Sequence, residues 1–181
     1  MPQAVTHFII PALLAAFFRV WYNKRHRPHI PLHYVFFAGL AGLLPDFDIG
    51  VIFILKILGL ATDGVHRTFT HSLIFPLIFV VLAIICYFVK YNPKWCERKR
   101  MKLSTILWIV AFGTFMHIFL DATIDWYLSP FLPFSNYQFG LNLFARLPSP
   151  LNSLAIPTLD AILFILWLVY LEVKHKISDF I

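Results

Sequence analysis

Five apolar runs of helical length constrain the fold of this chain more than any other feature. A bilayer core needs about 20 apolar residues per helix, and in lipid every backbone polar group must find its partner within the protein. With 60% hydrophobic and only 13% charged residues, the chain lies far from the average of soluble proteins. The sequence therefore predicts an all-α, polytopic integral membrane protein of about five transmembrane helices, over Ala4–Tyr22, Ile30–Leu44, Ser72–Tyr91, Leu103–Leu128 and Thr158–Val173.

The segments between these runs fit around a single bundle. Ile49–Leu60 is too short to span a bilayer and carries Lys56, which favours a re-entrant or interfacial helix. Ser129–Pro157 is rich in proline and asparagine and is expected to form irregular structure over one membrane face. No internal repeat is visible, so residues 1–181 are interpreted as one membrane-embedded helical domain.

The basic residues predict the orientation. Alternating the five runs across the membrane places twelve of the 15 Lys and Arg residues on one side, and only Lys56, Arg67 and Arg146 on the other. Because Lys and Arg are enriched in cytoplasmic loops, the N-terminus and the stretch Asp46–Ser72 are expected on the non-cytoplasmic side of a cell (inner) membrane. The basic residues are not interleaved with aromatics on a soluble face, so no nucleic-acid partner is expected.

Metal-binding residue types gather at the predicted outer ends of the helices. His117 and Asp121 are four residues apart on an apolar helix, so both side chains lie on one face, one turn apart. That spacing suits two ligands of one metal ion, and ionisable groups within a membrane are costly and tend to be functional. A hydrogen-bonded His–Asp pair inside the bundle is the structural alternative. Asp125, one turn further, is a candidate to bond a ligand or a bridging water.

Two carboxylates follow the second apolar run, in the sequence Leu-Pro-Asp-Phe-Asp. Pro45 restricts the residue before it and ends the helix, so Asp46 and Asp48 emerge from a turn. Carboxylates suit hard or borderline divalent cations, and imidazoles add zinc, manganese or iron to the candidates. A solvated helix end is the alternative, but carboxylates are unfavourable near a helix C-terminus and call for a positive partner.

The densest polar cluster, His66–Ser72, directly precedes the third apolar run. His66 and His71 are five residues apart and would diverge by about 140° on a regular helix, so one is expected to bind metal and the other to hydrogen-bond or donate a proton. Arg67 fits a phosphate or a carboxylate by paired hydrogen bonds, unless it is an interfacial, snorkelling arginine. Thr70 or Ser72 is a candidate helix cap.

His7 is a metal-binding candidate because it is expected to meet the other polar residues at the outer face. A single histidine at a helix start is usually structural, but this one is expected at the same depth as His117. His26, His29, His33 and His175 lie on the basic side and are interpreted as interfacial residues, and Asp160 as a helix-dipole partner at the start of the fifth run.

The elements LPDFD, HRTFTHS and HIFLDAT, in this order, resemble those of the YdjM-like family of membrane-bound metal-dependent hydrolases. The resemblance extends from His7 to the end of the fourth run and implies a hydrolase of the inner membrane.

A more distant similarity is to the all-helical zinc phospholipase C and P1-nuclease class. It assigns metal binding to five residues of this chain: His7, Asp46, His66, His117 and Asp121. That class also uses its mature N-terminal residue and a further set of ligands, which this chain lacks. One or two ions, Zn²⁺ or Mn²⁺, are therefore expected.

These observations lead to one functional hypothesis and two rivals. The hypothesis is a metal-dependent hydrolase acting on a phosphoester of a membrane lipid or lipid-linked substrate, with Arg67 holding the phosphate and Asp48 or His71 orienting water or protonating the leaving group. An ion or metal transporter is the first rival, although such sites usually lie near the bilayer midplane. A membrane adaptor that uses the basic loop Lys90–Lys102 is the second. No sequence feature indicates an oligomeric state.

Overall fold

The computed structural model describes residues 4–26, 30–62, 68–124 and 127–175. Within these residues the secondary structure is helical, with one isolated antiparallel bridge between Leu128 and Phe139 and no named strand. The longer helices are α1 (Ala4–Asn23), α2 (His33–Leu43), α4 (Ile74–Val89), α6 (Leu103–Ile124) and α7 (Leu151–His175). The shorter ones are the 3-10 helix η1 (Leu44–Phe47), α3 (Asp48–Ile57) and α5 (Lys94–Arg98).

The helix lengths confirm the predicted fold class. Four stretches are long and apolar enough to cross a membrane, namely Ala4–Asn23, His33–Ile57, Leu103–Ile124 and Leu151–Lys174, and Ile74–Val89 is a shorter apolar helix. The protein is therefore all-helical and polytopic, with five apolar helical stretches in the described part of the chain.

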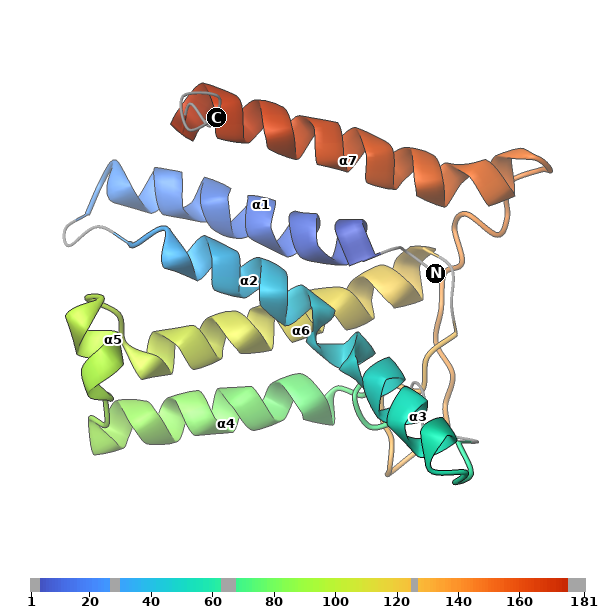
Figure 1. The fold of residues 1–181 in the computed structure, drawn as a ribbon, viewed down its shortest axis with the longest axis horizontal. Helices are drawn as coiled ribbons and strands as arrows, with labels where there is room; N and C mark the ends of the chain where they lie inside the picture. Colours follow the sequence, from blue (N-terminus) through green and yellow to red (C-terminus); the bar gives the residue numbers. More distant parts are fainter. Residues whose placement is uncertain (1–3, 27–29, 63–67, 125–126, 176–181) are drawn as a thin grey trace.

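The second stretch is broken rather than continuous. Pro45 lies at the start of η1, where the backbone tightens between α2 and α3. The helix expected over Ile49–Leu60 is present as α3, which follows η1 without a loop and projects from the bundle (Figure 1). The break matters because Asp46 lies within it.

Two predicted boundaries were wrong. The irregular segment was expected to extend to Pro157, but α7 begins at Leu151 and contains that proline, as α1 contains Pro11. Proline is tolerated in membrane helices because neighbouring groups can satisfy the freed carbonyl. The fourth run was expected to extend to Leu128, but α6 ends at Ile124. Backbone N–H groups of the following loop bind the last carbonyls of α6: Leu141 to Ala122, Leu143 to Thr123 and Phe144 to Ile124.

Helix α6 lies at the centre of the bundle, with α2 and α4 packed against it, while α1 packs between α2 and α7 (Figure 1). Small residues permit these close approaches. A Cβ atom added to Gly113 of α6 would lie 2.5 Å from the Cβ atom of Ala41 in α2. Membrane helices that lack a hydrophobic driving force associate through such close contacts between small residues.

The distribution of side chains is the reverse of that in a soluble protein. The largest fully buried side chains include three histidines, two threonines and an aspartate. By contrast, large apolar side chains such as Phe53 and Phe88 are 65% and 76% exposed. An apolar exterior matches a lipid environment. The polar interior forms one cluster, which lies where α1, η1, α6 and the turn before α4 meet.

Candidate metal centre

Four buried side chains and one partly exposed side chain, from four segments, form the centre. His7 comes from the start of α1, Asp46 from η1, His71 from the turn before α4, and His117 and Asp121 from successive turns of α6. His7 and Asp121 are each 1% exposed, His117 is fully buried, and only Asp46 retains partial exposure. Among the described residues, the polar cluster is therefore partly open at Asp46.

Carboxylate oxygens of Asp46 and Asp121 lie beside a pair of imidazole nitrogens. The Nε2 atoms of His71 and His117 are 3.2 Å apart. The Oδ1 atom of Asp46 lies 3.5 Å from Nε2 of His71 and 3.6 Å from Nε2 of His117. The Oδ2 atom of Asp121 lies 3.6 Å from each of the two nitrogens. Ligand atoms around a tetrahedral zinc ion, at its usual bond lengths, are separated by about 3.3 Å.

The backbone carbonyl of Gly42 determines which ring nitrogen of His117 carries the hydrogen. The Nδ1 atom of His117 lies 2.7 Å from the carbonyl oxygen of Gly42, which can only accept a hydrogen bond. Nδ1 must therefore carry the hydrogen, and Nε2 of the neutral ring presents its lone pair to His71 and the two carboxylates.

The hydroxyl group of Thr70 determines which ring nitrogen of His71 carries the hydrogen. The Oγ1 atom of Thr70 donates its one hydrogen to Oδ2 of Asp48 at 3.0 Å, so it can only accept from Nδ1 of His71, which is also 3.0 Å away. Asp48 Oδ2 lies 3.7 Å from the same Nδ1. With the hydrogen on Nδ1, Nε2 of His71 also presents a lone pair to the cluster.

Two imidazole lone pairs and two carboxylate oxygens facing one another repel unless a metal ion or a proton lies between them. Consistent with this, Oδ1 of Asp46 and both carboxylate oxygens of Asp121 are buried and have no hydrogen-bond partner among the residues that the structure describes. Buried polar atoms are normally paired, so these oxygens require a partner. The group of Asp46, His71 and His117, with one carboxylate and two imidazoles, fits a divalent metal ion and can bind one.

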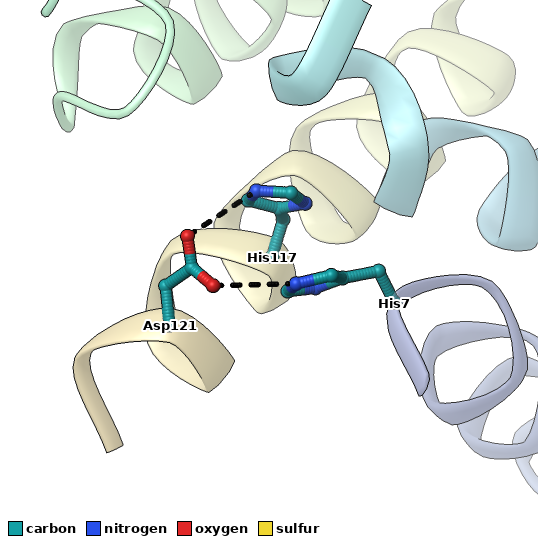
Figure 2. Close-up of side chains that lie close together, drawn as sticks. All are labelled: His7, His117 and Asp121. Atoms are coloured by element: carbon teal, nitrogen blue, oxygen red, sulfur yellow. Dashed lines mark ion pairs between the residues drawn. The ribbon is translucent and has the colours of Figure 1, made fainter. Parts of the chain in front are cut away.

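The two carboxylate oxygens of Asp121 face different histidines. Its Oδ2 atom faces His117, while its Oδ1 atom lies 3.3 Å from Nε2 of His7 (Figure 2). The rings of His7 and His117 stack with centroids 3.9 Å apart. Two overlapping groups can each hold a metal ion: Asp46, His71 and His117 form one, and His7, His117 and Asp121 form the other.

The start of α1, and with it His7, is anchored by α7. The carboxylate oxygen Oδ1 of Asp160 accepts hydrogen bonds from the backbone N–H and the hydroxyl group of Thr6, which precedes His7. Thr6 is fully buried and Asp160 is 5% exposed. Because α7 begins at Leu151, Asp160 lies well inside this helix and bonds α1, so its prediction as a dipole partner at the helix start was wrong.

The structure brings together His7, Asp46, His71, His117 and Asp121 among the residues singled out in the sequence. Asp48 lies against the opposite edge of the His71 ring, at Nδ1. The predicted site residues His66 and Arg67, and also Asp125, lie outside the described residues. The expected cap of α4 was wrong: Leu73 precedes that helix without a side-chain cap, the Thr70 hydroxyl donates to Asp48, and Ser72 donates to the Phe69 carbonyl.

Sequence reasoning missed three contributors to the centre. The carbonyl of Gly42 has no side-chain signal, and the contact between Thr6 and Asp160 joins residues 154 positions apart. Thr70 was noted, but as a cap. Its place directly before His71, in a motif with a nearby aspartate, is the signal that could have indicated a hydrogen bond to the ring.

Fold and centre together define a polytopic, all-helical membrane protein with a buried histidine–aspartate cluster able to bind a metal ion. The sequence profile of the YdjM inner membrane protein family matches residues 1–177, and the chain belongs to this family. The resemblance to that family is thereby confirmed, as is the inner membrane as its location. No curated protein and no solved structure matches the chain significantly, so the distant similarity to the zinc phospholipase C and P1-nuclease class is not shown.

Proposed function

We propose that this protein is a Zn²⁺- or Mn²⁺-dependent hydrolase that cleaves a phosphoester of a lipid-linked substrate at the non-cytoplasmic face of the membrane. The observation that carries the proposal is the pair of imidazole nitrogens of His71 and His117, 3.2 Å apart, which each lie 3.5 to 3.6 Å from an oxygen of Asp46 and from an oxygen of Asp121. A permanently protonated histidine pair is the alternative explanation of this arrangement, and metal analysis distinguishes the two.

The chain's own residues would preorganise such a centre. The Gly42 carbonyl holds His117, and Thr70 with Asp48 holds His71, each through the ring nitrogen that faces away from the cluster. Hydrogen bonds of this kind orient metal-binding imidazoles and make them more basic. A bound divalent ion supplies Lewis acidity and activates water for attack at neutral pH. Arg67 remains our candidate for holding the substrate phosphate.

The lipid-linked substrate is inferred from the surroundings of the centre. The helices that carry it expose large apolar side chains, such as Phe115 and Phe119 on α6, at 46% and 51%. A substrate that approaches the cluster along these apolar surfaces lies in the bilayer, which favours a lipid-linked molecule. Partial exposure of Asp46, at 22%, supports approach from the η1 side of the cluster.

Metal content tests the proposal directly. Elemental mass spectrometry of the detergent-purified protein is expected to find zinc or manganese near one or two ions per chain, with a loss of most of it in His117→Ala and in Asp121→Ala. His33→Ala is the matched control, because His33 is exposed and does not belong to the cluster. Absence of metal from the parent protein, or equal content in all four proteins, would refute the metal centre.

Activity is tested on the protein that retains metal. Release of phosphate from p-nitrophenyl phosphate and from phosphatidic acid in mixed micelles is expected for the parent, and a loss of about 100-fold or more for Asp121→Ala. Turnover of the micellar lipid alone would support the lipid-linked substrate. A metal-loaded protein inactive on every phosphoester offered would overturn the hydrolase proposal while leaving the metal centre intact.

A metal transporter is the second candidate, and the break between α2 and α3 favours it. Transporters often place a ligand where a membrane helix is interrupted, as Asp46 is placed in η1. Uptake of radioactive zinc into vesicles containing the protein, abolished in His117→Ala, would favour transport. Phosphoester cleavage without uptake would favour the hydrolase.

A further inference from the structure

A hollow of about 430 Å³ with both polar and apolar lining residues lies at the far end of α4 and α6 from the metal centre. Its wall comes from the last turn of α4, the first residues of α6 and the short segments that join both helices to α5. Lys90, Asn92, Lys102 and Ser104 contribute its polar groups, and the rings of Tyr87 and Tyr91 contribute part of the remainder. None of these residues takes part in the proposed hydrolase.

The backbone at both lysines is fixed by hydrogen bonds. Lys90 ends α4 in a left-handed conformation, with φ of 56° and its N–H bonded to the Tyr87 carbonyl. The N–H of Lys102 donates to the hydroxyl group of buried Tyr34 at 2.8 Å. Between them, Asn92 donates to the Met101 carbonyl and accepts from the N–H of Leu103. The segments on both sides of the hollow are therefore joined.

The charge around the hollow is strongly positive. Residues 90–102 contain six Lys and Arg residues, all exposed, and Glu97 is the one acidic residue among them. The positive-inside rule accounts for the sign of this charge but does not account for a shaped hollow between two of the lysines. Basic pockets between membrane helices on the cytoplasmic side are typical sites for anionic lipid head groups.

We propose that this hollow binds the phosphate head group of an anionic phospholipid in the cytoplasmic leaflet, with Lys90 and Lys102 paired to the phosphate and Ser104 as an additional hydrogen-bond donor. The apolar flank of the hollow, including Phe88 and Leu103, lies beside the first part of the acyl chains. The binding site is independent of the metal centre and would hold a lipid whether or not the protein is a hydrolase.

Native mass spectrometry of the full-length protein in detergent tests this site. Titration with phosphatidylglycerol is expected to give a first binding step several-fold tighter than titration with phosphatidylcholine. Lys90→Gln with Lys102→Gln is expected to weaken that step by about tenfold or more, since each basic residue near anionic head groups contributes about fivefold. Lys90→Arg with Lys102→Arg should retain the binding, which separates loss of charge from misfolding.

The matched control is Lys99→Gln with Arg100→Gln, which removes the same charge from the same loop but from residues that do not line the hollow. This control is expected to leave the first step within about threefold. Equal weakening in both pairs would show diffuse attraction and overturn the site. Displacement of the lipid by millimolar inorganic phosphate, or of both lipids by an acidic peptide, would overturn the assignment to a phospholipid.

Discussion

At the residue scale, the centre depends on which nitrogen of each imidazole carries the hydrogen. Gly42 places it on Nδ1 of His117, and Thr70 places it on Nδ1 of His71. Both Nε2 atoms thereby present lone pairs to each other, beside carboxylate oxygens that have no hydrogen-bond partner within the described part of the chain. A neutral imidazole can ligate a metal only through its unprotonated nitrogen, so the groups behind the rings matter as much as the rings.

The variant Asp48→Asn tests this dependence. An asparagine amide can donate to Thr70 Oγ1, which frees the threonine hydrogen to bond Nδ1 of His71 and moves the ring hydrogen to Nε2. We expect the affinity for zinc, measured by competition with a chromophoric chelator, to fall by about 10- to 100-fold. Glu97→Gln is the control, because it neutralises a carboxylate in α5, away from the cluster. Unchanged affinity in Asp48→Asn would contradict the role assigned to Asp48.

At the element scale, the cluster exists because α1, α2 and α6 approach closely. A Cβ atom on Gly42 would lie 2.0 Å from the carbonyl oxygen of His7, so the absence of a side chain there lets α1 reach α2. The same glycine carbonyl bonds His117 of α6. One position in α2 thus joins it to α1 and α6, the two helices that supply His7, His117 and Asp121.

Gly42→Ala is therefore expected to damage both the packing and the centre. The added methyl group must push α1 away from α2, and overpacking of this kind costs about 1–3 kcal/mol. We expect a lower midpoint of thermal unfolding in detergent and reduced metal content. Gly50→Ala is the matched control, since a Cβ atom there has nothing within 4 Å and alanine favours a helix over glycine. Equal stability of the two variants would contradict the close approach as described.

At the scale of the whole molecule, the protein places polar groups inside and apolar groups outside, as a bilayer requires. Its two ends differ: the metal centre lies toward one, and the basic hollow lies at the other. With the positive-inside rule, this polarity leads us to propose that the centre faces the non-cytoplasmic side.

Labelling of introduced cysteines tests the orientation. In a background with Cys86 and Cys96 replaced by alanine, Tyr137→Cys lies in the exposed loop before α7, and Lys99→Cys lies in the exposed basic loop. A membrane-impermeant maleimide applied to intact cells with a permeabilised outer envelope is expected to label the first and to spare the second until the inner membrane is opened. The reverse pattern would place the centre on the cytoplasmic side.

The sequence by itself determined the fold class, the approximate helices and four of the clustered residues: His7, Asp46, His117 and Asp121. Hydropathy is a local property, and the spacing of His117 and Asp121 on one helix fixes their shared face. The family elements are also local, since each lies within a few consecutive residues. These features can be predicted from the sequence because they do not depend on how the helices pack against one another.

Only the tertiary structure decided which atoms meet. The placement of His71 opposite His117, the bonding of Gly42 to His117, and the anchoring of Thr6 by Asp160 each join separate segments. The early end of α6 was likewise missed, because loop residues 141–144 bond its last carbonyls, and the early start of α7 was missed because a membrane helix tolerates Pro157. Helix packing sets the directions of lone pairs, and no periodicity in a single segment encodes them.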